Sequence, residues 1–122
     1  MFLATINKKH RLLHVSYICE VTVADLERGY EDLKSIVHEF PDGFILFADL
    51  GRMKSMDPAC ADIIGKTMEL FDKSGVERIV RLFPDPSLDI GLNILSAFHY
   101  SSRRPIATCD SMAAAVRALH LQ

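Results

Sequence analysis

The clearest pattern along the chain is a continuous apolar run over residues 44–48, followed by polar residues and then by helical periodicity. The run is too short for a buried helix, and its aromatic residues favour a strand that is covered on both faces. The strand is expected to end at residues 49–51, and residues 52–56 predict a short polar loop. Asp57 and Pro58 then predict a helix start, because Asp is a common N-cap and Pro a common first helical residue.

A hairpin and a helix are predicted before this run. Residues 2–6 and 11–19 have strand patterns, and the polar residues between them suit a hairpin turn. Thr22 and Asp25 match the capping-box pattern of a helix start. Apolar residues then recur at intervals of about three and four as far as residue 40, which predicts one buried face on an amphipathic helix.

Two further strand and helix pairs are predicted after the helix that begins at Asp57. Residues 76–83 predict a strand, and an apolar stripe predicts a helix from Ser87. Residues 105–108 predict a last strand, and Asp110 is expected to cap a last helix. The order ββαβαβαβα predicts one α/β domain over residues 1–122, with a mixed sheet of about five strands and about four helices.

Composition narrows the possible functions. The 122 residues carry a formal net charge of -2, with 25% charged and 49% hydrophobic residues, as is typical of a globular domain. This balance predicts no broad attraction to nucleic acid. No apolar run approaches about 20 residues and no signal-peptide pattern is present, so we expect a cytoplasmic protein without membrane insertion.

Cysteines and histidines give no metal or cofactor pattern. Cys19, Cys60 and Cys109 are widely spaced, so we expect reduced thiols rather than disulfides or zinc ligands. His10 and His14 lack a third ligand at a diagnostic spacing, and we interpret them as surface side chains. The sequence therefore predicts no metal site and no cofactor.

Two local motifs stand out, one at the carboxyl end of the central strand and one at the start of the helix after it. They are Phe47, Ala48, Asp49 and Leu50 in the strand, and Met56 and Asp57 at the helix start. Together with the order of elements over nearly the whole chain, they resemble the STAS domain of anti-sigma factor antagonists and of the cytoplasmic tails of sulphate transporters. The resemblance implies a non-catalytic regulatory module that binds a protein partner, of the anti-sigma factor or switch-kinase class.

One motif departs from that family. In the antagonists the aspartate is followed by a serine pair and a glycine, and a partner kinase phosphorylates one serine to switch binding off. Here Asp57 is followed by Pro58, Ala59 and Cys60, so neither serine position carries a hydroxyl. The chain thus resembles a divergent member without the usual phospho-switch. A divergent branch related in architecture to lipid-binding SEC14-type domains also lacks this serine.

The resemblance implies a partner surface on the predicted loop and on the exposed face of the helix that follows it. A homodimer through an apolar helix face is left open. The expected partner-binding residues are Arg52, Lys54, Ser55, Met56, Asp57, Asp62, Lys66 and Glu69.

An anion or another small ligand is a second hypothesis for the carboxyl end of the central strand. Ligands commonly bind at this edge of open α/β sheets, and a helix N-terminus attracts anions. Asp49 is also a candidate ion-pair partner for Arg78 or Arg81, which interrupt the next strand. The residues of this second site would be Asp49, Arg52, Ser55 and Cys60.

Two other functions stay open from the sequence. A SEC14-like domain would hold an apolar or acyl ligand between sheet and helix. An enzyme would use Cys60, since backbone donors near a helix start favour a thiolate, but it would also need a base, and no histidine is near in sequence. A small buried residue is the simpler interpretation of Cys60, and we predict no catalytic residue. The ligand pocket would be lined by Phe71, Leu92, Leu95 and Phe98.

Overall fold

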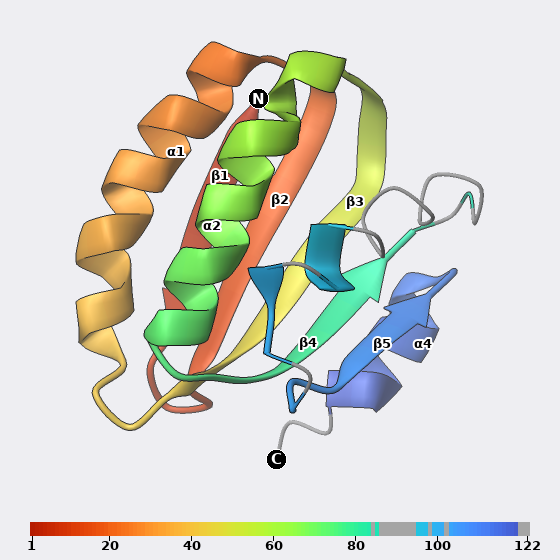
Figure 1. Ribbon diagram of the computed structural model, residues 1–122. Helices are drawn as coiled ribbons and strands as arrows, with labels where there is room; N and C mark the ends of the chain where they lie inside the picture. Colours follow the sequence, from red (N-terminus) through yellow and green to blue (C-terminus); the bar gives the residue numbers. More distant parts are fainter. Residues whose placement is uncertain (84, 86–94, 98, 102, 120–122) are drawn as a thin grey trace.

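The fold is a mixed five-stranded sheet with helices on both faces (Figure 1). The computed structural model describes residues 1–83, 85, 95–97, 99–101 and 103–119. The strands lie in the order of the chain, with β1 antiparallel to β2 and all later neighbours parallel. This confirms the predicted mixed sheet. The strands are β1 Phe2–Asn7, β2 Leu12–Val21, β3 Phe44–Met56, β4 Val76–Leu82 and β5 Ile106–Cys109.

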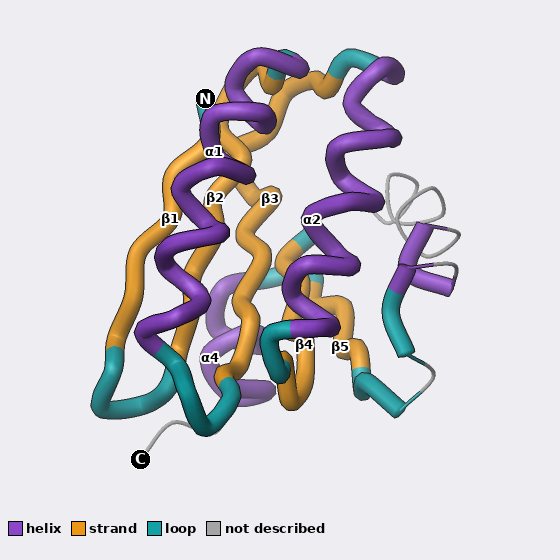
Figure 2. Tube along the Cα trace, turned by 60° about the vertical axis from the view of Figure 1, so that its left-hand side comes forward, coloured by secondary structure: helices purple, strands orange, loops and turns teal. Residues whose placement is uncertain are grey.

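Helices α1 (Val23–Ile36) and α2 (Ala61–Lys73) cover one face of the sheet, and α4 (Met112–Leu119) covers part of the other (Figures 1 and 2). The larger core lies between the sheet and the α1–α2 pair, and a smaller core lies beneath α4. Short 3₁₀ turns follow α1 and precede α2, at Val37–Glu39 and Pro58–Cys60.

The helix starts largely follow the predicted caps. Thr22 and Asp25 exchange hydrogen bonds between side chain and backbone at 3.2 and 3.1 Å, which is the predicted capping box. The cap predicted at Asp110 is wrong, because the Ser111 hydroxyl instead accepts a hydrogen bond from the Ala114 N–H. Residues 95–97 and 99 are helical, and the rest of the helix predicted from Ser87 lies outside the described residues.

Strand β3 is buried on both faces over residues 44–50. Phe44, Leu46, Ala48 and Leu50 belong to the larger core, while Ile45 and Phe47 belong to the smaller one. The polar loop predicted for residues 52–56 is wrong, because β3 continues to Met56 and pairs with the end of β2 through two register irregularities. The backbone of β2 supplies the hydrogen bonds there, so a strand forms although the side chains are mostly polar.

Two glycines allow β3 and β4 to begin side by side. Gly43 and Gly75 have φ values of 91° and 94°, which L side chains rarely adopt. A Cβ atom on Gly43 would stand 2.8 Å from the Gly75 carbonyl oxygen. The Phe44 N–H donates to that oxygen at 3.2 Å, so the close approach joins the starts of the two strands.

Arg78 connects β4 to the end of α4. Its guanidinium donates to the Ala118 carbonyl at 2.6 Å and also to the Leu119 carbonyl. These carbonyls lie in the last turn of α4, where helical partners are missing and the helix dipole favours a cation. Arg78 therefore holds α4 against the sheet.

We expect Arg78→Ala to lower the free energy of unfolding by about 1.5–3 kcal/mol, because carbonyls that accept from a charged donor lose their partner. Arg103→Ala is the control, since Arg103 is exposed, and it is expected to change stability by less than about 0.5 kcal/mol. Urea unfolding followed by circular dichroism measures both variants. Equal stabilities of the two variants would contradict the role given to Arg78.

Candidate functional site

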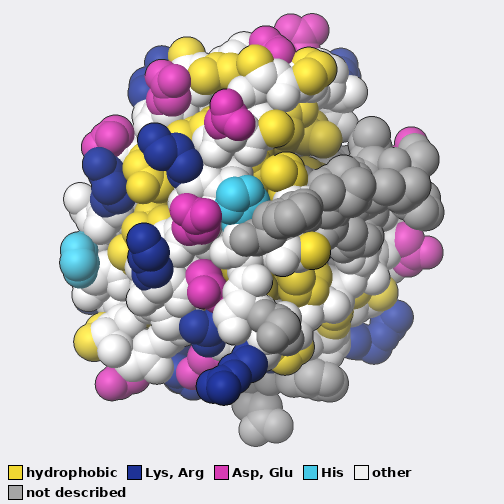
Figure 3. Space-filling view, viewed as in Figure 1, with side chains coloured by type: hydrophobic (Ala, Val, Ile, Leu, Met, Phe, Trp, Pro, Cys, Tyr) yellow, Lys and Arg dark blue, Asp and Glu magenta, His cyan; other side chains and the backbone are white. Residues whose placement is uncertain are grey.

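An open apolar groove lies between the end of β3 and the start of α2, and we call it the β3–α2 groove. Its volume is about 360 Å³. Hydrophobic side chains gather on the surface in this region, beside the beginning of α2 (Figure 3). The groove is lined by Leu50, Met53, Lys54, Ser55, Met56, Asp57, Pro58, Ala61, Ile64, Phe83 and Leu95.

The backbone at the start of α2 shapes one wall of this groove. The Asp57 carboxylate accepts a hydrogen bond from the Ala59 N–H at 2.9 Å, and Pro58 takes the first position, as predicted for an N-cap. The Asp57 N–H in turn donates to the Val21 carbonyl at 3.2 Å. The helix start is thereby fixed to the end of β2.

The groove combines a buried apolar floor with a charged rim. Leu50, Ile64 and Phe83 are buried, whereas Lys54 and Asp57 are exposed. A surface of this kind suits the burial of apolar side chains from a partner, with charges at the edge that orient it. Sequence reasoning had assigned the rim residues to a partner surface but had missed the floor, because core and groove residues follow the same apolar pattern.

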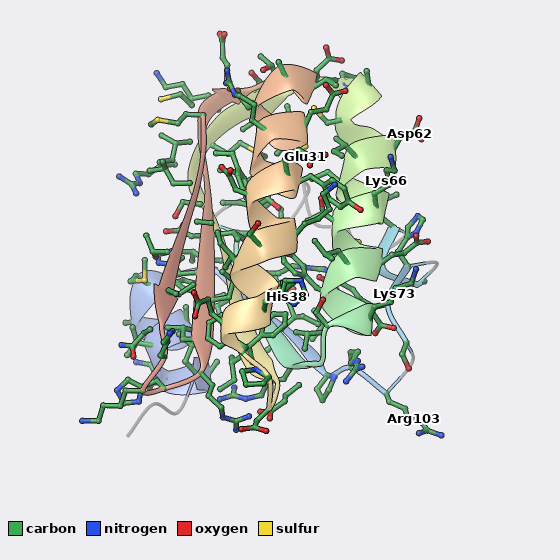
Figure 4. All side chains as sticks on the ribbon, turned by 90° about the vertical axis from the view of Figure 1, so that its left-hand side faces the viewer. Glu31, His38, Asp62, Lys66, Lys73 and Arg103 are labelled. Atoms are coloured by element: carbon green, nitrogen blue, oxygen red, sulfur yellow. The ribbon has the colours of Figure 1, made fainter. Side chains whose placement is uncertain are left out.

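A second groove lies between α1 and α2, and we call it the α1–α2 groove. Its volume is about 580 Å³, and its lining includes Glu31, Asp62 and Lys66 (Figure 4). The ammonium of Lys66 lies 5.8 Å from the centroid of the Tyr30 ring, and that of Lys34 lies 5.4 Å from it. Charged side chains therefore dominate this groove.

The expected partner-binding residues are divided between these two grooves. Arg52 and Glu69 line neither groove, and the Glu69 carboxylate lies 2.9 Å from His99 Nδ1. The start of α2 separates the residues that line one groove from those that line the other. The eight expected residues therefore do not form one continuous pocket. Lys54, Ser55, Met56 and Asp57 line the β3–α2 groove, and Asp62 and Lys66 line the α1–α2 groove.

The structure does not bring together the residues expected to form an anion site. Cys60 belongs to the larger core, whereas Asp49 follows Ile45 and Phe47 on the opposite face of the sheet. The Asp49 carboxylate accepts from the Gly51 N–H at 2.9 Å and lies 3.7 Å from His14 Nε2. An Asp49–Cys60 site is therefore a wrong expectation, because the side chains of a strand alternate between faces.

His14 and Asp49 form a small polar cluster with Ser16. The Ser16 hydroxyl lies 3.2 Å from the same Nε2 atom of His14 that faces Asp49. The His14 ring stacks on Phe47, with 4.7 Å between the ring centroids. A serine nucleophile activated by histidine needs the carboxylate at the other ring nitrogen, so this arrangement does not match that catalytic geometry.

Arg81 is a buried cation on the side of the larger core. It pairs with Ala48 in the sheet register, so it points away from the face that carries Asp49. Arg81 is therefore not the partner of Asp49, for which Arg78 and Arg81 were the two candidates. Its guanidinium donates to the Ser96 hydroxyl. Burial raises the pKa of the neighbouring Tyr17 to about 12, although Arg81 opposes this shift, so that side chain stays neutral.

Cys60 is fully buried, with an exposed fraction of 0%. Its thiol lies 3.8 Å from the Val21 carbonyl oxygen. Burial, followed by the charges of Asp57 and Asp25, raises the pKa of the Cys60 thiol. The thiolate expected from a helix start is therefore disfavoured, because desolvation outweighs the backbone donors.

The space between sheet and α2 is nearly filled. The cavity there measures about 30 Å³, which is roughly the volume of one water molecule. Phe71 lines it, while Leu95 lines the open β3–α2 groove instead. Leu92 and Phe98 lie outside the described residues. The described interior thus has no room for an acyl chain.

Within the described part of the chain, His, Cys, Asp and Glu side chains do not gather in any group of three or more that could hold a metal ion. The helices of that part are all too short or too polar to cross a membrane.

Comparison with known proteins gives matches at the level of structure. Neither a protein-family model nor a curated protein sequence matches the chain. An uncharacterized DUF3478 family protein from Shewanella loihica, described as having a SpoIIAA-like fold, gives a TM-score of 0.72 at 12% identity, covering 98% of this chain and 92% of that one. The chain has the SpoIIAA-like fold. The STAS-like fold predicted from the sequence is thereby confirmed.

Anti-sigma factor antagonists share this SpoIIAA-like fold. The phosphorylated form of SpoIIAA from Bacillus gives a TM-score of 0.67 at 10% identity, covering 98% of this chain and 100% of that one. An anti-sigma factor antagonist from Mycobacterium paratuberculosis gives a TM-score of 0.60 at 17% identity, with coverages of 98% and 94%. At these identities the likeness establishes the fold alone.

The capping role of Asp57 can be tested by stability. We expect Asp57→Ala to lower the free energy of unfolding by about 1 kcal/mol, since the Ala59 N–H loses its acceptor. Glu27→Ala, at an exposed position on α1, is the control and should change it by less than about 0.5 kcal/mol. No measurable loss for Asp57→Ala in urea unfolding would show that the cap contributes nothing.

Thiol labelling tests the environment of Cys60. Under native conditions at mildly alkaline pH, we expect iodoacetamide to modify exposed Cys19 first, and Cys60 only after the protein is unfolded. The physical reason is burial, which blocks access and also disfavours the thiolate. Mass spectrometry of the peptides gives the order, and labelling of Cys60 ahead of Cys19 in the native protein would restore the enzyme hypothesis.

Proposed function

We propose that the chain is a non-catalytic regulatory module that binds a protein partner through the β3–α2 groove. The observation that carries this proposal is the groove itself, which joins a buried apolar floor to the exposed charges of Lys54 and Asp57. A partner would insert apolar side chains over Leu50, Ile64 and Phe83. Surfaces with an apolar centre and a polar rim are typical of protein interfaces.

The fold supports the same class of function. Anti-sigma factor antagonists have this fold, so an anti-sigma factor or a related switch kinase is the partner class that we propose, in a cytoplasmic setting. The nearly filled interior favours surface recognition over a ligand held between sheet and helix. Exposed Asp62 and Lys66, on the other side of the start of α2, would extend the contact surface.

Regulation of this binding would differ from the usual serine switch. Pro58 and Ala59 have no group that accepts a phosphoryl group from a serine kinase, and the Cys60 thiol is buried. The start of α2 therefore offers no site for that modification. We propose that partner binding here is not switched off by phosphorylation at these positions.

A charge placed in the groove tests the proposal. Ala61 is exposed and lines the β3–α2 groove, whereas Ala59 is exposed and lines the α1–α2 groove. We expect Ala61→Glu to weaken partner binding by about tenfold or more, since the new carboxylate must be desolvated in an apolar contact. Ala59→Glu, at the same helix start, is the matched control and should weaken binding much less, because it lies outside the apolar floor of the β3–α2 groove.

The measurement begins with native mass spectrometry of the protein purified from its own host, which identifies an accompanying protein by its mass. Isothermal titration of that protein against both variants then gives the affinities. If Ala59→Glu weakens partner binding and Ala61→Glu does not, the interface lies at the α1–α2 groove instead. A small molecule that leaves on denaturation, without any protein partner, would overturn the proposal in favour of ligand binding.

A further inference from the structure

Strand β1 forms a free edge of the sheet, and its backbone has unused hydrogen-bonding groups. Met1 and Ile18 exchange two backbone hydrogen bonds, at 2.9 and 2.8 Å. In an antiparallel pair, bonded and non-bonded positions alternate, so Phe2, Ala4 and Ile6 direct their N–H and C=O groups away from β2. Among the described residues, none supplies a hydrogen-bond partner to these outward groups.

The edge lacks the features that normally block the addition of another strand. Proteins protect such edges with a charged side chain, a proline or a bulge. Strand β1 has the sequence FLATIN, and its register with β2 is regular throughout. Leu3 and Ile6 are also 48% and 40% exposed, so both backbone and side chains are available.

A groove runs along this edge beneath α1, and we call it the β1–α1 groove. Its volume is about 440 Å³, and Phe2, Leu3 and Ala4 line it on the side of the strand. Gly29 lets α1 approach closely, since a Cβ atom there would stand 2.3 Å from the Phe2 ring. Figure 4 looks onto this side of the molecule. The helix side of the groove is lined by Gly29, Asp32, Ser35 and Ile36.

Asp32 gives the groove a charge preference. Two other acidic residues of α1 are already paired, because Asp25 bonds Arg28 at 2.9 Å and Glu31 bonds Lys34 at 2.8 Å. Asp32 is exposed in the groove and has no ion-pair partner within the described residues. An unpaired carboxylate beside a sheet edge favours a basic side chain on whatever strand adds there.

From these features we infer that the β1–α1 groove binds an extended peptide segment of another protein, which adds a strand to β1 and places a lysine or arginine opposite Asp32. Backbone groups of Phe2, Ala4 and Ile6 supply the affinity, and the groove selects the side chains. This site is separate from the β3–α2 groove and does not depend on the function proposed for it.

A second copy of the chain lacks the side chain that this edge selects. Strand β1 of a second copy would bring the sequence FLATIN, which holds no lysine or arginine to place opposite Asp32. A segment of another protein that carries a basic residue meets this requirement.

Nuclear magnetic resonance with a defined probe tests the inference. The probe is a blocked peptide as long as β1, with alternating valine and threonine and one central arginine. We expect the amide signals of Phe2, Ala4 and Ile6 to shift and to gain protection from exchange, while those of Leu3 and Thr5 stay bonded to β2 as before.

Two variants separate backbone pairing from charge. Ala4→Pro removes an outward N–H without breaking a bond to β2, so it should abolish peptide binding, while Ala4→Ser keeps the N–H and should bind normally. Asp32→Asn should weaken binding of the arginine peptide about threefold to tenfold. Asp62→Asn, in the α1–α2 groove, is its control and should have no effect.

Three results would overturn the inference. The first is the absence of shifts at β1 with about millimolar peptide. The second is equal binding by Ala4→Pro and Ala4→Ser. The third is protection of Phe2, Ala4 and Ile6 that rises with protein concentration without any peptide, which would show that a second copy occupies the edge. None of these results bears on binding at the β3–α2 groove.

Discussion

Strand β3 is bonded on both edges and covered on both faces, and the other described elements are arranged around it. Its alternating side chains supply both cores, so α1 and α2 must lie on one face and α4 on the other. The close contact of Gly43 with Gly75 starts β4 beside it. Parallel neighbours in a sheet require crossover connections, which here carry α1 and α2.

The β3–α2 groove arises because β3 is longer on one side than on the other. Strand β2 pairs with β3 as far as Met56, but β4 pairs with it only as far as Asp49. Beyond Asp49, the edge of β3 that faces β4 has no neighbouring strand. Leu50 and Met53 lie in this part of β3 and face α2. The apolar pattern of the core therefore continues to the surface, and the groove lies where the sheet narrows.

The fold could be predicted from the sequence because burial leaves a clear pattern in most elements, such as the continuous apolar run of residues 44–48 and the helical stripe that begins after Thr22. Residues 52–56 could not be assigned correctly, because their pairing depends on the backbone of β2 rather than on their own side chains. Arg78 and Arg81 were both candidate partners of Asp49, but only the register of β3 against β4 shows that Arg81 faces the opposite way. The pKa of the Cys60 thiol is raised, because burial has a larger effect on it than its position near a helix start.

The two proposed binding sites differ in the physics of recognition. The β3–α2 groove would select its partner by the shape and apolar character of side chains, whereas the β1 edge offers mainly backbone groups and one carboxylate. Backbone pairing tolerates many sequences, so specificity at the edge rests on Asp32 and on the other side chains that line the β1–α1 groove. The two grooves share no lining residue, since one lies between β3 and α2 and the other between β1 and α1, so each can be occupied separately. A partner that carried both an extended basic segment and an apolar contact would bind more tightly than either part alone, because the first contact raises the effective concentration of the second.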